Sequence, residues 1–151
     1  MIRETIQNEV VAAMKGGDRK RTAALRLVTA KIKDRDIEQR TAASTPDDDE
    51  LVQDVLLKMA KQRRESIAMY DDGGRTELAD QERFELAVIE EFLPRQMDES
   101  ETRAAIAAIK SDLAAAGLKD MGRVMAELKA RHGASLDMTR ASALVKESLS
   151  A

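Results

Sequence analysis

The sequence contains no cysteine and a single histidine, His132, and aromatic residues make up only 2% of its 151 residues. Without cysteine the chain forms no disulfide and offers no thiol nucleophile or thiolate metal site. One histidine cannot supply a multi-histidine metal site, and so few aromatic side chains cannot form a platform on which bases stack. These absences favour binding over catalysis. We predict no catalytic residue, no bound metal and no cofactor.

Long apolar runs are also missing. No run approaches the ~18 residues of a membrane span, and Arg3 and Glu4 stand where a signal peptide would need apolar residues. Hydrophobic residues make up 43% of the chain and charged residues 35%, with two prolines and seven glycines, which is enough apolar material for a core. We expect a globular, cytoplasmic protein without a membrane contact.

Apolar residues recur at helical spacing, and no sustained two-residue alternation is present, so the sequence predicts an all-α fold. We expect helices over residues 2–15, 18–40, 46–70, 76–93, 99–116, 120–132 and 137–149. Their ends follow from caps, glycines and prolines, including Pro46 in a first turn and Gly117 after a last turn.

The same spacing predicts which side chains are buried. In the first four helices these are Ile2, Ile6, Val10, Met14, Leu25, Val28, Ile32, Ile37, Leu51, Val52, Val55, Leu56, Met59, Ile67, Tyr70, Leu78, Leu86, Ile89, Phe92 and Leu93. In the last three helices they are Ile106, Ile109, Leu113, Met121, Val124, Met125, Leu128, Met138, Leu144, Val145 and Leu149.

Capping signals restart after Pro94, where Asp98 and Glu101 have the spacing of a capping box. We therefore predict an N-terminal domain over residues 1–93, a bundle of about four helices, and a smaller three-helix domain over residues 94–151. A three-helix unit of this size is marginally stable alone, so we expect it to lean on the first half or on a partner.

Basic residues are concentrated in two stretches, although the whole chain has a net charge of -3. Residues 18–33 contain six basic residues and one acidic residue. Within and beyond this stretch Arg19, Arg26, Lys33 and Arg40 are seven residues apart, so on a helix they form one slowly drifting stripe. The stripe is either a solvated face or a contact for an anionic partner, and Arg26, next to Leu25, could also be structural.

The second basic stretch runs from residue 118 to residue 146 and contains six basic residues against three acidic ones. The basic residues are Lys119, Arg123, Lys129, Arg131, Arg140 and Lys146. Either they contact the phosphates of a nucleic acid, or Glu127 pairs with Arg123 and Arg131 across one helical turn, which would be a purely structural role.

Gly122 is unusual because a glycine inside a helix costs about 1 kcal/mol relative to alanine. Either a neighbouring helix packs closely against it or a ligand approaches it closely, and packing is the favoured explanation. Met121, Met125 and Met138 could form an adaptable apolar surface for a protein partner, although their helical spacing is more typical of a core.

Several segments together resemble the GatB/YqeY family, and the match is collinear over nearly the whole chain. The segments are Lys61–Tyr70, Gly74-Arg75, Leu78-Ala79 with Glu82, Glu91–Pro94, Gln96-Met97 and Lys119–Met125, with Leu25-Arg26 upstream. The sequence is similar to the stand-alone YqeY-like branch rather than to a fragment of a larger enzyme.

The resemblance implies an all-helical, two-part module that is shared with the end of the B subunit of the glutamine-dependent aminoacyl-tRNA amidotransferase, a carbon–nitrogen ligase. In that enzyme the module contacts tRNA, and catalysis takes place in other domains. The resemblance therefore implies a non-catalytic, tRNA-binding accessory module, with Lys119–Arg123 as the tail motif and Gly122 as its small residue. The alternative is an adaptor that docks on a tRNA-dependent amidotransferase or synthetase.

Overall fold

The computed structural model describes residues 1–150, which contain seven α-helices, two short 3₁₀ helices and no strand. The all-α fold class predicted from helical spacing is therefore confirmed for these residues. The chain divides into two compact units, with the boundary between Leu93 and Pro94. None of the helices in the described residues combines the length and apolar character that crossing a membrane requires.

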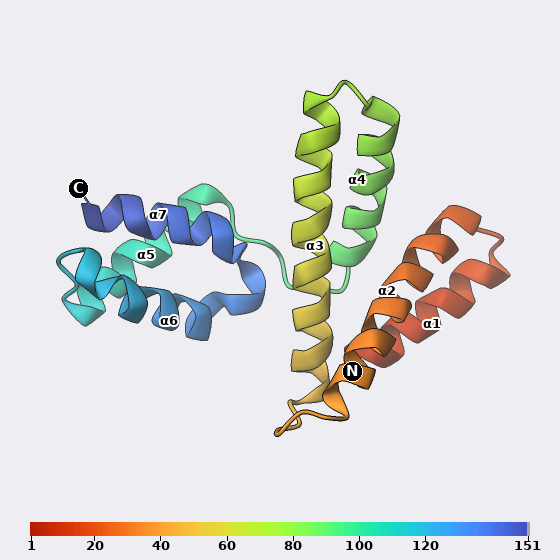
Figure 1. Cartoon of the computed structure of the whole chain (residues 1–151), viewed down its shortest axis with the longest axis horizontal. Coiled ribbons are helices and arrows are strands. Elements are labelled where there is room, and N and C mark those ends of the chain that lie inside the picture. The colour runs from red at the N-terminus through yellow and green to blue at the C-terminus, as the bar shows by residue number, and fades with distance from the viewer. Residues whose placement is uncertain (151) are drawn as a thin grey trace. The chain divides into compact units, whose positions relative to one another are not determined.

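The N-terminal unit consists of two helical hairpins (Figure 1). The first pairs α1 (Ile2–Lys15) with α2 (Arg19–Gln39), and the second pairs the long α3 (Asp48–Asp72) with α4 (Thr76–Glu90). Short turns around Gly17 and Gly74, both with positive φ, join the two helices of each hairpin. Such turns make the joined helices antiparallel neighbours.

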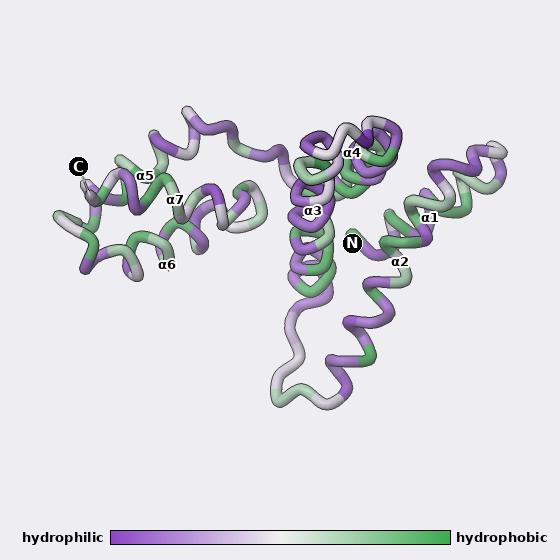
Figure 2. Tube along the Cα trace, turned by 45° about the horizontal axis from the view of Figure 1, so that its top comes forward, coloured by the Kyte–Doolittle hydropathy of each residue, from purple (hydrophilic) through white to green (hydrophobic). Residues whose placement is uncertain are grey.

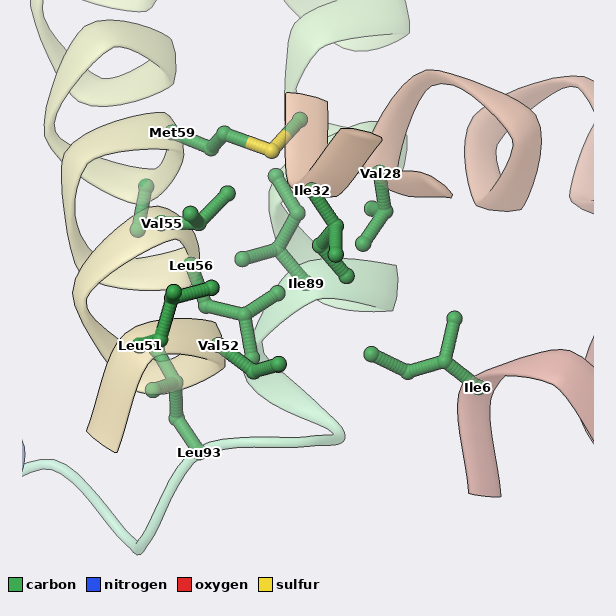
Figure 3. Close-up of a cluster of buried hydrophobic side chains, with 11 residues drawn as sticks. Ile6, Val28, Ile32, Leu51, Val52, Val55, Leu56, Met59, Ile89 and Leu93 are labelled. Atoms are coloured by element: carbon green, nitrogen blue, oxygen red, sulfur yellow. The ribbon is translucent and has the colours of Figure 1, made fainter. Parts of the chain in front are cut away.

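All four helices of this unit contribute aliphatic side chains to one core (Figure 3). Ile6 of α1, Ile32 of α2, Leu56 of α3 and Ile89 of α4 are almost completely buried and point toward a shared centre. A smaller cluster around Leu25 and Val88 continues the core between the first hairpin and α4. Figure 2 shows hydrophobic and hydrophilic stretches alternating along the helices, as expected for amphipathic helices.

Three side chains that the spacing placed in this core are exposed instead. Met14 and Ile37 lie near the ends of α1 and α2 and are 54% and 57% exposed. Leu78 is 43% exposed, because α4 is rotated so that the fully buried Ala79 faces the core in its place. Leu86, Phe92, Ile2 and Val10 are partly buried against the core. Ile67 and Tyr70 in α3 are half-buried.

Arginines join the helices of the N-terminal unit through carboxylates. Arg3 of α1 contacts Asp36 of α2 at 2.9 Å and Asp48 of α3 at 2.8 Å. The hydrogen bonds from Arg3 hold the pKa of Asp48 below its usual value. Asp49 accepts the backbone N–H of Ile2 at 3.0 Å, so the beginnings of α1 and α3 are tied together.

The sequence predicts that this helix begins at Pro46, but α3 begins at Asp48. The connection to α1 explains the difference. Asp47 is the N-cap residue of α3, and its side chain makes no capping hydrogen bond. Thr45 is not the N-cap. The acidic side chains of Asp48 and Asp49 lie in the first turn, where the helix dipole favours negative charge, and both have partners on α1.

The C-terminal unit contains α5 (Glu99–Leu113), α6 (Met121–His132) and α7 (Met138–Ser150), with η1 (Leu118–Asp120) and η2 (Gly133–Ser135) before and after α6. Ile106, Ile109, Val124, Leu128 and Val145 form its core. Asp98 and Glu101 form the predicted capping box at α5, with both hydrogen bonds present. Leu113 ends α5 earlier than expected, because Ala114 and not Gly117 takes the left-handed conformation.

Limited proteolysis should cut the connections at residues 41–46 or 94–98 before it cuts within Leu51–Tyr70. Both connections lie outside the helices, and exposed connections are cleaved before helical segments. Mass spectrometry of the first fragments checks this outcome. Early cleavage within α3 would contradict the helix and domain boundaries given above.

Replacing Arg3 by alanine should destabilise the N-terminal unit by about 1 kcal/mol, because one guanidinium holds carboxylates on two other helices. The contribution of Asp48 requires its charged form, since its pKa is lowered in the folded state. The difference in unfolding free energy between wild type and Arg3→Ala should therefore be largest above pH 3.8, the ordinary carboxyl pKa, and decrease as the pH falls further. Chemical unfolding at a series of pH values measures it, and a difference independent of pH would contradict the proposed pairing.

Candidate functional site

The six basic residues of the 118–146 stretch all lie exposed on the C-terminal unit. Lys119 is in η1, Arg123, Lys129 and Arg131 are in α6, and Arg140 and Lys146 are in α7. They differ in whether a carboxylate of the same chain already neutralises them, and this difference separates the candidate binding residues into two groups.

Arg123 is held by Asp120 at the beginning of α6. Its guanidinium donates to the Asp120 carboxylate at 2.8 Å and more weakly to the Leu113 carbonyl at 3.4 Å. Asp120 is only 8% exposed and also accepts the backbone N–H of Ala116 at 2.9 Å. The hydrogen bond from Ala116 and then that from Arg123 lower the pKa of Asp120, so its carboxylate stays charged. Arg123 therefore fixes the entry to α6.

Arg131 is held from two sides, by Glu127 at 2.7 Å and by Asp112 of α5 at 2.9 Å. The sequence-based pairing of Glu127 with Arg131 is thus present, whereas the partner of Arg123 is Asp120. Arg140 lies 4.0 Å from Glu99, at the limit of an ion pair. These arginines join elements of the C-terminal unit and are less available to a partner than their exposure suggests.

The three lysines of the stretch have no such partner. Within residues 1–150 no carboxylate pairs with Lys119, Lys129 or Lys146. Lysine ammonium groups are compact point charges on flexible stems, which suits contact with phosphates. The available positive charge of this unit therefore comes from lysines.

Gly122 lies on the open side of α6, and the expectation that a neighbouring helix packs against it is wrong. A Cβ added at Gly122 would meet no heavy atom of the described chain within 4 Å, beyond its immediate surroundings in the helix. Gly122, Ala126 and Ala130 are exposed and follow each other at four-residue spacing, so the outer face of α6 has almost no side-chain relief. Lys129, seven residues after Gly122, lies on the edge of this same face.

The methionines considered for an adaptor surface belong to the interior. Met121, Met125 and Met138 are half-buried and pack against the C-terminal core. These three side chains therefore do not form an exposed apolar surface of their own.

The N-terminal stripe lies on α2 and just after its end. Arg19, Arg26, Lys33 and Arg40 are all exposed, and no carboxylate in the described residues pairs with any of them. Arg26 points away from the core and donates weakly to the sulfur of Met14 at 3.6 Å, so it has no structural ion pair. The two basic groups thus occupy different units of the chain.

One acidic residue of residues 1–150 has a raised pKa and takes part in an ion-pair cluster. Burial raises the pKa of Glu82, but Glu82 lies 3.2 Å from Arg63, which also binds Glu85 at 2.9 Å. This cluster joins α3 to α4. No group of His, Cys, Asp and Glu in the described residues could hold a metal ion.

The sequence matches the family described as "Yqey-like protein" over residues 3–149. The chain belongs to this family. The match covers both units and all seven helices, including the Lys119–Arg123 segment and Gly122. No curated protein matches the sequence.

In this Yqey-like chain, replacing Gly122 by alanine should stabilise the C-terminal unit by up to about 1 kcal/mol. Alanine has the higher helix propensity, and its methyl group has open space here. The measurement is the free energy of unfolding, followed by the helical circular dichroism signal. A loss of stability would show that a neighbouring element does pack on Gly122.

Proposed function

We propose that this Yqey-like chain is a non-catalytic accessory module that binds tRNA, and that the outer face of α6 is the contact. One observation supports the site above all others. The exposed face of Gly122, Ala126 and Ala130 has no side chain larger than a methyl group, and the unpaired Lys119 and Lys129 border it. A phosphate backbone can approach such a face closely and meet positive charge there.

The electrostatics of the face favour phosphate over carboxylate ligands of defined geometry. Arg123 and Arg131, which could grip a planar carboxylate with two hydrogen bonds, are already bound to Asp120, Glu127 and Asp112. Lys119, in η1 just before α6, and Lys129, in α6, remain as point charges on flexible stems. Charges so arranged bind an extended anion with modest affinity and a strong dependence on salt.

The composition supports recognition of folded RNA rather than of single strands. With aromatic residues at 2% of the chain, unstacked bases find few rings to stack on. Double-stranded RNA is recognised mainly through its backbone, its 2′-hydroxyl groups and its shape, which requires no aromatic side chain. The resemblance to the tail of the tRNA-dependent amidotransferase agrees with this kind of recognition.

We assign no catalytic residue to the chain, and we link it to carbon–nitrogen ligase activity only by its family association. In this proposal residues 94–151 form a separate tail domain that contacts RNA, and residues 1–93 form the domain that other proteins meet. The partner enzyme would be a tRNA-dependent amidotransferase or synthetase of the cytoplasm.

The double variant Lys119→Ala/Lys129→Ala should weaken binding of total tRNA several-fold. It should also lower the slope of log affinity against log salt concentration by about 1–2, because two phosphate contacts are lost. Filter binding at several salt concentrations measures both quantities. Helicity and unfolding should be unchanged, since neither lysine has an intrachain partner in the described residues.

A matched control replaces two exposed arginines, Arg95 in the connection before α5 and Arg103 within α5, which are paired with Glu101 and Glu99. This control removes the same charge from the same unit but away from α6, so its salt slope should stay close to that of the wild type. Equal losses of tRNA affinity in both double variants would show that binding depends on net charge and not on α6. Absence of salt-sensitive tRNA binding by the wild-type protein at micromolar concentrations would overturn the proposed function.

A further inference from the structure

The basic stripe on α2 is interleaved with apolar residues in a regular pattern. Between Arg19, Arg26 and Lys33 and after them lie Ala23, Ala30 and Ile37, so the six residues follow each other at steps of four, three, four, three and four. This is the spacing of a coiled-coil seam, in which both sets of positions face a partner helix. All six side chains are exposed, and Figure 2 shows hydrophilic and hydrophobic residues alternating along α2.

The seam continues into a hollow at the turn between α1 and α2. The hollow has a volume of about 310 Å³ and is lined by Ala13, Met14, Gly17, Arg19, Ala23 and Arg26, among others. Met14, which helical spacing placed in the core, forms part of this wall. Because Met14 and Ile37 are both exposed, an apolar side chain lies at each end of the seam.

The charges of the seam are not neutralised by ion pairs among the described residues. No carboxylate of residues 1–150 pairs with Arg19, Arg26 or Lys33. Asp18 also borders the hollow, but its carboxylate accepts the backbone N–H of Arg21 at 3.0 Å and caps α2. The face thus offers three cations that have no ion-pair partner in the described residues, together with a row of apolar side chains, and the exposed Asp18 and Asp34 flank it.

We propose that this face of α2 binds an acidic amphipathic helix of another protein, with Asp or Glu at one set of core positions and aliphatic residues at the other. Charge complementarity selects this occupant. A second copy of the chain would bring the same three cations to the seam, so buried cations would lack counter-charges in either orientation. The inference concerns the N-terminal unit and does not rest on the RNA contact proposed for α6.

RNA is the less suitable occupant of this face. Phosphates could bind the three cations, but they would leave Ala23, Ala30, Ile37 and Met14 uncovered. A helix whose apolar residues alternate with carboxylates covers both kinds of side chain over the length of about 27 Å that the seam spans. The proposed partner therefore uses all of the face, whereas RNA would use half of it.

The experiment uses a fluorescein-labelled synthetic peptide of about three heptads with glutamate at every a position and leucine at every d position. The control peptide has lysine in place of glutamate. Titration of the full chain, followed by fluorescence anisotropy, should give an affinity for the acidic peptide at least about ten times higher than for the control peptide. Equal affinities, or no binding of the acidic peptide, would overturn the proposal.

Two variants separate the seam from general electrostatic attraction. Arg19→Glu/Arg26→Glu/Lys33→Glu should reverse the preference, so that the lysine peptide binds more tightly than the acidic one. Ala23→Gln/Ala30→Gln keeps every charge but places bulky polar groups in the seam, and it should weaken acidic-peptide binding by about fivefold or more. Unchanged binding in the glutamine variant would show that charge alone attracts the peptide, and the seam would be refuted.

A further control is Lys61→Glu/Arg75→Glu, which reverses two exposed charges of the same unit outside α2 and should leave the preference for the acidic peptide intact. Unfolding curves of all variants confirm that each is folded. Total tRNA is titrated in parallel. Loss of tRNA binding in the triple variant, together with failure of the acidic peptide to bind the wild type, would identify the stripe as an RNA surface and overturn the proposal.

Discussion

The antiparallel packing of α3 against α4 determines the arrangement of the N-terminal unit. Leu56 and Ile89 meet at its centre, and Ile32 of α2 and Ile6 of α1 join them there. Because the chain has only three aromatic residues, this core depends on the close fit of aliphatic side chains. Arg63 strengthens the same hairpin by binding Glu82 and Glu85 at its half-buried edge, so Glu82, whose pKa is raised by burial, serves the structure of this unit.

The basic side chains fall into two groups, which differ in whether they pair with carboxylates of the same chain. Arg3, Arg21, Arg63, Arg123 and Arg131 each hold carboxylates and thereby connect elements of the fold. Lys119, Lys129 and the α2 stripe have no such partner in residues 1–150. A count of basic residues in the sequence does not distinguish paired from unpaired side chains, whereas the structure does. The two surfaces left over are chemically distinct: the face on α6 is almost flat and borders lysines, and the face on α2 combines cations with apolar side chains.

Helical spacing and caps predicted the fold class and nearly all helices, because both signals are local. The capping box at Asp98 is complete within four residues, so nothing distant could alter it. The failures have distant causes. The beginning of α3 depends on Asp49 bonding to Ile2, and the exposure of Leu78 depends on how α4 is rotated against α3. Neither relation can be read from residues close in sequence.

The sequence predicted which basic residues belong to the candidate site, but not which of them form ion pairs. The sequence identified the basic residues of the 118–146 stretch, yet it could not show that Asp120 and Asp112 bind Arg123 and Arg131. It also favoured a packed Gly122, because the cost of glycine in a helix indicates a constraint without indicating its source. The alternation of Ala23, Ala30 and Ile37 with the cations is visible in the sequence, but only the structure shows that these side chains are exposed.

Asp120 has a consequence for the energetics of binding at α6. Its carboxylate accepts the N–H of Ala116 and the guanidinium of Arg123, so the loop before the helix is ordered when the chain folds. Lys119 precedes Asp120 directly, and its backbone is therefore fixed before any partner arrives. An anion that meets Lys119 has to restrict one side chain and no loop, which keeps the entropic cost of association small. Folding thus fixes in advance the backbone geometry that a partner of this face would encounter.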